Sequence, residues 1–257
     1  WREKEAVVFL ENGQNKYQLG GSSGADQASD EIIKTELSAA EASGQTTLSV
    51  DSSATMAASD VVGIELDNAT IHWSTISSIP DTTSIVIALA LTSAAAIDKN
   101  VYAYTSAIGR PLSISSCRLL KDDGTETKMW PISRHVYFSI PNKDTKGTPI
   151  QYFVDKQRDY TNIYVYPTPD TVDNRLRITY QRIIEDFDSS TDDADLPQEW
   201  LGALAYNLAM VVAPKYGKEE KAAQVLAPLA SQYLEGLKAN DQESASLRIR
   251  PNIQDYC

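Results

Sequence analysis

The sequence predicts an α+β protein, with a β-rich middle that carries an inserted antiparallel β module and a C-terminal antiparallel helical hairpin. Three observations support this prediction. Apolar and polar residues alternate in most segments between residues 6 and 184, which is the period of a β-strand. Apolar residues recur every three or four positions between residues 201 and 237, which is the period of a helix. With 42% hydrophobic and 23% charged residues, the 257-residue chain can bury a core.

The charge distribution excludes a dedicated nucleic-acid-binding protein. The net charge is −12: residues 1–109 hold 5 basic and 14 acidic side chains, residues 110–182 hold 12 and 8, and residues 183–257 hold 6 and 13. Only the middle of the chain is basic. Nucleic-acid-binding domains usually have a pI above about 9, whereas this sequence has a pI of about 4.6. Tight binding to phosphates is therefore not expected.

The sequence also limits where the protein works. The longest apolar run, residues 85–91, is far shorter than the roughly 20 residues of a membrane-spanning helix, so we expect a soluble protein without a membrane partner. Cys117 and Cys257 form neither a disulfide framework nor a metal-ligand spacing, which fits a reducing compartment. The chain opens on Trp1 without a secretion signal. We expect that it belongs to a longer or processed gene product.

Residues 1–34 are predicted to form a β-hairpin and a linker. Two apolar runs, residues 7–10 and 17–19, flank Asn12-Gly13, which is a hairpin signal. Gly20 and Gly21 then open an acidic segment that extends to residue 31. The Gly-Lys-Ser/Thr sequence of a phosphate-binding loop is missing there, so we interpret the segment as a flexible linker.

Residues 35–106 are predicted to form an inserted antiparallel β module of about five strands. The segment is rich in Ser, Thr, Ala, Val and Ile, and its apolar residues alternate with polar ones. Asp67-Asn68 and Pro80-Asp81 provide turn signals. The flanking sequences are more aromatic and more charged, which indicates an insertion.

Residues 107–184 are predicted to form the β region of the core. Asp123-Gly124 lies between two apolar runs and predicts a hairpin. Further strand-like runs cover residues 137–140, 150–154, 163–166 and 176–180. Several of them carry Arg or Lys on the face opposite the aromatic residues, as in a sheet with one solvated side.

Residues 185–240 are predicted to form an acidic loop and the helical hairpin. The loop, residues 185–195, has no basic residue. It departs from the calcium-loop pattern because Thr191 replaces the required Gly and Pro197 replaces the bidentate Glu. We interpret it as a solvated loop whose last residue, Asp195, caps the following helix together with Gln198.

The predicted hairpin has a helix on each side of a short connection. Ala213-Pro214 and Gly217 end the first helix, and the second helix is expected to bend at Pro228. Residues 241–257 lack a period and are predicted to form an extended C-terminal arm. We expect the core of the hairpin to contain Trp200, Leu204, Leu208, Leu226 and Tyr233.

The sequence contains no recognisable catalytic, cofactor or metal site. His72 and His135 are both expected on strands, and neither has a His or Cys at metal-ligand spacing, so we interpret both as structural and partly buried. Nucleophile-elbow, Walker-type and His-Glu-x-x-His motifs are missing. We therefore expect a protein that is not an enzyme and needs no cofactor.

Short segments in both halves of the chain resemble a known family. Residues 196–200 (LPQEW), 206–209 (YNLA) and 213–217 (APKYG) resemble the C-terminal helical hairpin of head-to-tail adaptor proteins of tailed bacteriophages, also called connector or tail-tubular-A-like proteins. Residues 46–50, 60–64 and 70–75 are similar to a β insertion that recurs in phage proteins of this kind. Together these segments extend over most of the chain.

The resemblance implies a structural virion protein of the neck or tail, assembled in the host cytoplasm. It implies a ring, commonly of twelve copies, that lies below the portal protein and carries a downstream tail or nozzle protein. It also implies that genome DNA passes through the lumen of the ring without sequence-specific binding. A subunit with a net negative charge does not bind the DNA phosphates tightly, so the DNA can slide through. Such proteins usually begin with helices that complete a bundle with the hairpin, so we expect helices upstream of Trp1.

The C-terminal arm is expected to bind the portal. Apolar and basic groups alternate in it at Leu247, Arg248, Ile249 and Arg250. A partner could bury the two apolar side chains and pair the two arginines with carboxylates. Two other functions stay open. The β-rich middle and the exposed-looking Tyr160, Tyr164 and Tyr166 also suit a carbohydrate- or receptor-binding tail component, and a glycan hydrolase would require two carboxylates in one cleft.

Overall fold

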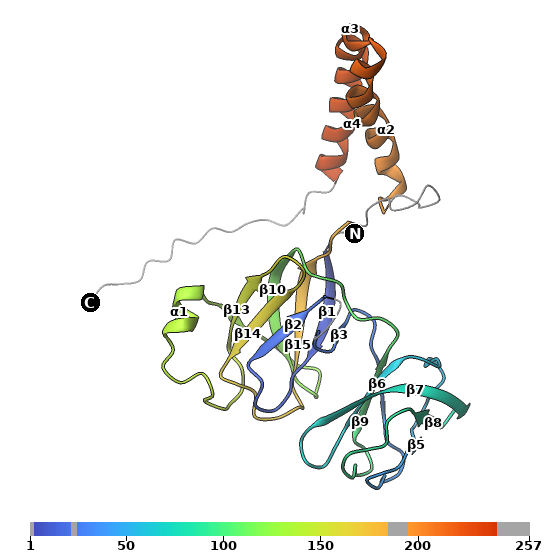
Figure 1. Cartoon of the computed structure of the whole chain (residues 1–257), viewed down its shortest axis with the longest axis vertical. Coiled ribbons are helices and arrows are strands. Elements are labelled where there is room, and N and C mark those ends of the chain that lie inside the picture. Colours follow the sequence, from blue (N-terminus) through green and yellow to red (C-terminus); the bar gives the residue numbers. More distant parts are fainter. Residues whose placement is uncertain (1–2, 22–24, 185–194, 241–257) are drawn as a thin grey trace. The chain divides into compact units, whose positions relative to one another are not determined.

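The computed structural model describes residues 3–21, 25–184 and 195–240. The chain divides into two compact units, Trp1–Ile184 and Glu185–Cys257. The first unit contains the β-sheets and one short helix, and the second contains the C-terminal helices (Figure 1). The α+β class with a β-rich middle is confirmed.

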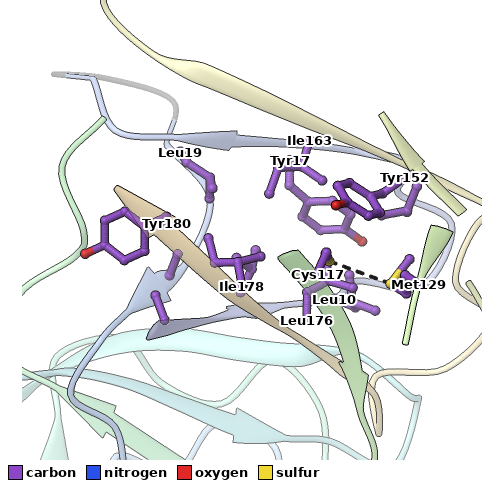
Figure 2. Packing of buried hydrophobic residues seen from close by; sticks show 14 of the residues in the cluster. Leu10, Tyr17, Leu19, Cys117, Met129, Tyr152, Ile163, Leu176, Ile178 and Tyr180 are labelled. Carbon is purple, nitrogen blue, oxygen red and sulfur yellow. Dashed lines mark hydrogen bonds between the residues drawn. The ribbon is translucent and has the colours of Figure 1, made fainter. Parts of the chain in front are cut away.

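The first unit contains a β-sandwich. Its five-stranded sheet has the order β11 (Glu126–Lys128), β10 (Ser113–Leu120), β15 (Arg175–Gln181), β1 (Glu3–Phe9) and β3 (Ala28–Ser29). Its four-stranded sheet has the order β12 (Trp130–Pro131), β13 (Gln151–Lys156), β14 (Thr161–Tyr166) and β2 (Lys16–Leu19). Side chains from both sheets form one core, part of which Figure 2 shows.

The sandwich core is apolar apart from a few satisfied polar atoms. The Tyr17 ring is fully buried, and its hydroxyl donates to the Gln14 carbonyl at 2.9 Å and accepts from the Glu11 amide at 3.0 Å. Cys117 Sγ lies 3.7 Å from Met129 Sδ. Burial raises the pKa of the Cys117 thiol to about 12, so this cysteine is an inert core residue.

Residues 33–104 form a second sheet with a core of its own. The strand order is β4 (Ile33–Glu36), β9 (Asn100–Tyr104), β6 (Val61–Glu65), β7 (Ile71–Asp81), β8 (Ser84–Ile87) and β5 (Thr47–Ser49), all antiparallel. The alternation predicted for Leu48 and Val50, and for Ile85 and Ile87, places all four side chains in this core. We call the sheet the β module. It has six strands instead of the five expected, and its peripheral, inserted character stays a prediction.

A cluster of aromatic rings joins the β module to the sandwich. Phe9 of β1 lies 4.9 Å from the rings of both Trp73 and Tyr102. The indole nitrogen of Trp73 donates to Glu11 at 3.1 Å. Val172 of the sandwich packs in the same cluster. The module therefore contacts β1 and the segment that precedes β15.

The second unit consists of helices, of which α2 and α4 pack against each other. The described part begins with η1 (Gln198–Trp200), α2 (Leu201–Val212) and η2 (Ala213–Tyr216). It continues with α3 (Glu219–Lys221), a π-helical turn η3 (Ala222–Leu226) and α4 (Ala227–Asn240). The predicted helix end is confirmed, since Pro214 follows α2 and Gly217 has a left-handed φ of 61°. The N-cap of η1 is Pro197, so the cap predicted at Asp195 is wrong.

Two predicted elements at the sandwich are wrong. The turn at Asn12-Gly13 exists, but β1 pairs with β15 and β3 while β2 pairs with β14. Local turn chemistry cannot show that the chain crosses from one sheet to the other. Residues 137–140 are not a strand, because Ser133 caps the helix α1 (Arg134–Ser139) by accepting from the Val136 amide at 3.3 Å. The hairpin predicted at Asp123-Gly124 is confirmed by the pairing of β10 with β11.

The predicted linker is ordered where the structure describes it. Ala28 and Ser29 pair with β1, and the Asp26 carboxylate accepts from the Gln18 amide at 2.6 Å and from the Gln14 side chain at 2.8 Å. Only residues 22–24 lie outside the described residues here. The prediction of a flexible linker is wrong for the remainder.

Candidate interaction surfaces

Titratable side chains in the described residues do not form a catalytic or metal constellation. Within residues 3–21, 25–184 and 195–240, no group of three or more His, Cys, Asp or Glu could hold a metal ion. His72 is buried and its Nε2 lies 3.1 Å from the Leu89 carbonyl, which is a structural role, as predicted. His135 is exposed in α1, so its predicted place on a strand and its partial burial are wrong.

The outer face of the five-stranded sheet carries paired charges. Arg118 forms ion pairs with Glu5 and with Glu126, the latter at 3.0 Å, and Arg177 also pairs with Glu126. These residues come from four neighbouring strands, so the pairs form a cross-strand ladder. The ladder satisfies its own charges and suits a solvated face, as predicted for one side of the sheet.

The outer face of the four-stranded sheet is aromatic. Phe153 pairs with Tyr164 across β13 and β14, and their rings stack with centroids 5.6 Å apart. The helix α1 covers this pair: Tyr137 is buried with its centroid 5.1 Å from that of Tyr164, and Phe138 lies 6.2 Å from both rings. Tyr164 is therefore half-buried, as are Tyr160 and Tyr166, so these three tyrosines are not the exposed residues expected.

Four apolar side chains on and around this face remain in solvent. Trp130 of β12 is 61% exposed, and about half of each of the other three is exposed. We call them the aromatic patch: Trp130, Val136, Phe138 and Ile150. Trp130 lies next to Ile150, since its amide donates to the Ile150 carbonyl at 3.0 Å, and Val136 and Phe138 share α1. Exposed apolar side chains that gather in this way are typical of a contact surface.

Three cations lie on the aromatic patch. Lys128 Nζ is 5.1 Å from the Trp130 ring centroid, and Arg134 Cζ is 5.5 Å from that of Phe138. Lys143 Nζ is 5.8 Å from the Phe138 ring. Arg134 also pairs with Asp155 at 3.1 Å. Three of the basic residues that give the middle of the chain its positive charge therefore lie next to exposed aromatic rings.

A buried polar network links the β module to the sandwich. Glu65 of β6 accepts from Asn100 at 2.9 Å and from the Tyr102 hydroxyl at 3.0 Å. Asn100 also donates to Asp122 at 3.1 Å. Arg175 of β15 pairs with Asp122 at 3.2 Å, donates to the Tyr102 hydroxyl, and lies with its Cζ 4.9 Å from the Tyr102 ring. Sequence reasoning missed this network because its members are far apart along the chain.

The network shifts the acidities of its two carboxyl groups in opposite directions. Burial raises the pKa of Glu65, although the hydrogen bonds from Asn100 and Tyr102 oppose this change. Burial also acts to raise the pKa of Asp122, but hydrogen bonds from Asn100 and Lys34 hold it below the usual value. Glu65 is therefore the carboxyl group that is costly to ionise in the folded protein.

This shift predicts a pH-dependent effect of Glu65→Gln. Because the folded pKa of Glu65 lies above its unfolded value, the folded state binds the proton first as the pH falls, and the wild type gains stability that a non-titrating Gln cannot gain. The free energy of unfolding of the wild type minus that of Glu65→Gln should increase between pH 7 and pH 4.5. Urea unfolding at both pH values measures it. A difference that decreases toward pH 4.5 would contradict the assignment.

The helical unit exposes most of its large apolar side chains. Its buried residues are mainly small: Ala203, Ala213, Ala222, Ala230 and Leu237. The Tyr206 and Tyr233 rings stack with centroids 5.0 Å apart, and Gly202 lies beside the Tyr233 ring. Small residues let the helices approach closely, which leaves the larger side chains at the surface.

The expected hairpin core is largely uncovered within the described residues. Trp200 and Leu226 are half-buried, while Leu204, Leu208 and Tyr233 are 38%, 58% and 45% exposed. Leu201, Leu204, Leu208 and Val211 recur at three-and-four spacing, so they follow one face of α2, which we call the α2 stripe. Burial of the expected core residues stays a prediction for the assembled protein.

Two further expectations concern the chain ends and membranes. The arm residues Leu247, Arg248, Ile249 and Arg250 lie outside the described residues. Within the described helices, none is both long and apolar enough to cross a membrane.

Comparisons with known proteins identify one family. The family model described as SU10 adaptor protein matches residues 1–253. The curated proteins contain no match. Among solved structures, VP17, a capsid protein of bacteriophage P23-77, is 11% identical, with 71% of this chain and 72% of that chain covered. Its TM-score of 0.14 is too low to compare the folds.

The family match extends over nearly the whole chain. It confirms the prediction of a phage structural protein with an adaptor role, which is a component of the virion and contacts other head or tail proteins. The family is structural and is not an enzyme family. The more specific tail-tubular-A-like type stays a prediction. The chain belongs to the SU10 adaptor protein family.

Proposed function

We propose that this protein forms a ring, of twelve copies, below the portal and joins the capsid to the tail around the DNA channel. The observation that supports the proposal is the family match over residues 1–253. The α2 stripe adds physical support, because a helix pair that leaves four large apolar residues in solvent gains stability when a neighbour covers them.

In this proposal the helices form an antiparallel hairpin that completes a bundle. Either helices upstream of Trp1 or the helices of ring neighbours cover the α2 stripe. The C-terminal arm then reaches the portal and uses Leu247, Arg248, Ile249 and Arg250 as its contacts. The net charge of −12 prevents tight binding of DNA phosphates while the genome passes through the lumen. A downstream tail or nozzle protein binds the opposite end of the ring, and assembly takes place in the host cytoplasm.

The alternative of a carbohydrate- or receptor-binding component has lost one of the two observations that suggested it, the exposure of three tyrosines, and keeps only the β-rich middle. The tyrosines that suggested it are half-buried, and two of their rings have neighbours or strand partners within the sandwich. A fibre or lectin-like module also has no need of the C-terminal helices. We therefore propose no second function.

Electron microscopy of the purified protein, alone and mixed with its portal, tests the ring. Leu208→Asp should abolish ring formation because it places a carboxylate in the covered stripe, whereas Ser231→Asp, at an exposed position of α4, should not. Truncation after Asn240 should leave rings intact and strongly weaken portal binding. Rings that form normally with Leu208→Asp would contradict the role of the stripe, and unchanged portal binding after truncation would contradict the role of the arm.

A further inference from the structure

We propose that the aromatic patch of one copy binds the β module of the next copy, at a surface formed by Asp67, Ile97 and Asp98. We call this surface the acidic tip. The inference rests on the proposed ring and specifies which two surfaces meet at each subunit boundary. It follows from an apolar and a charge complementarity between two exposed surfaces of the first unit.

The acidic tip is a defined surface at one end of the β module. Ile97 is 54% exposed and lies in the connection between β8 and β9. The Asp67 carboxylate accepts from the Ala96 amide at 3.0 Å, which places Asp67 next to Ile97. Asp98 has a φ of 65°, and its amide donates to the Leu37 carbonyl at 2.9 Å. The tip therefore presents one apolar side chain between two exposed carboxylates on a hydrogen-bonded backbone.

The aromatic patch offers the opposite arrangement. Phe138 and Val136 of α1, together with Trp130, provide an apolar surface that can accept Ile97. Lys128 and Arg134 lie over the exposed rings, where they can pair with carboxylates that approach the patch. Burial of the rings removes water from these cations and strengthens such pairs.

The charge of the whole β module supports this choice of partner. Residues 33–104 hold eight Asp and Glu against two Lys. Asp51 and Asp81 are also exposed on the module, so the module as a whole carries an excess of negative charge. The patch belongs to the basic part of the chain, residues 110–182. A second copy of this chain thus supplies a partner of suitable charge and apolar character.

The positions of the two surfaces favour a head-to-tail contact. The patch lies on the outer face of the four-stranded sheet, whereas the module is joined to β1 and to the segment before β15 of the five-stranded sheet. Two different surfaces that bind each other produce a heterologous interface, which closes into a ring when the rotation between copies permits. A self-complementary dimer contact would instead use one surface twice.

Charge reversal tests the contact, because two variants that each weaken the ring should restore it when they are mixed. The patch variant is Lys128→Glu with Arg134→Glu. The tip variant is Asp67→Asn with Asp98→Lys, which keeps Ile97 and the side-chain oxygen that accepts from the Ala96 amide, and changes the charge of the tip residues from negative to positive. Each variant alone opposes like charges, so we expect its ring to dissociate at a protein concentration roughly tenfold or more above that of the wild type. Mixed in equal amounts, the two variants again oppose unlike charges at every boundary, and rings should reappear. Native mass spectrometry and electron microscopy measure both results.

The control is Lys121→Glu with Arg158→Glu, which reverses two exposed basic residues outside the patch. It should assemble like the wild type. Equal urea unfolding midpoints of all variants exclude misfolding. A second measurement uses Val136→Cys with Ile97→Cys in a Cys257→Ser background, which should give a ladder of cross-linked copies on oxidation. Lys121→Cys in place of Val136→Cys should give none, because Lys121 is exposed outside the patch.

The outcomes separate this inference from the proposed function. Wild-type protein that forms no ring would contradict the proposed function. Wild-type rings that survive in both reversed variants, or a mixture that stays dissociated, would overturn the inference and leave the ring standing. A patch variant that loses binding to double-stranded DNA while its rings persist would assign the patch to DNA and overturn the inference as well.

Discussion

Arg175→Met is expected to lower the free energy of unfolding of the first unit by about 3 kcal/mol. The Arg175 side chain is 7% exposed, and it pairs with Asp122 while its guanidinium lies over Tyr102. Removing Arg175 takes away the buried cation of this pair, so the Asp122 carboxylate keeps only Lys34, at 3.0 Å, as an ion-pair partner while it lies in one network with Glu65 through Asn100. The loss falls at the lower end of the range for buried pairs because Asp122 is 42% exposed.

Urea unfolding followed by tryptophan fluorescence measures this effect, since Trp73 lies in the junction between the β module and the sandwich. Arg158→Met is the matched control, because the Arg158 side chain is 94% exposed. Its effect should stay within about 0.5 kcal/mol. A loss below about 1 kcal/mol for Arg175→Met would show that the network adds little to the stability of the junction.

Gly20→Ala is expected to destabilise the sandwich by about 3 kcal/mol, through two separate costs. Gly20 has a φ of 70°, a left-handed conformation that disfavours a side chain. A Cβ atom at this position would also lie 2.4 Å from the backbone nitrogen of Arg110. Because the obstacle is backbone and not the end of a flexible side chain, either β2 or the segment before β10 must shift.

Gly44→Ala separates the two costs. Gly44 has a φ of 88°, but no atom lies within 4 Å of its added Cβ. The substitution should therefore cost only about 1 kcal/mol, from the backbone conformation alone. Thermal unfolding of both variants gives the comparison. Equal losses at the two positions would mean that the close approach to Arg110 does not constrain the fold.

The sequence alone determined the features that depend on local period and on turn residues. The alternation of Leu48, Val50, Ile85 and Ile87 reflects strands with one buried face, and this pattern is readable without a fold because the strand period is two. Gly217 ended the helix for an equally local reason, the left-handed exit that glycine tolerates. The prediction of a phage adaptor was likewise reached from short segments of sequence, and the family match confirms it.

Only the tertiary structure decided which strands pair and which side chains meet. Asn12-Gly13 predicted a turn correctly but not that its two strands enter different sheets, because pairing depends on contacts with β14 and β15, far away in the sequence. The same reason hid the network of Glu65, Asp122 and Arg175. It also hid the aromatic patch, whose members come from β12, from α1 and from the residue before β13. Helical period placed Leu204 and Leu208 on one face of α2, but it could not show that close packing through small residues leaves that face exposed among the residues that the structure describes.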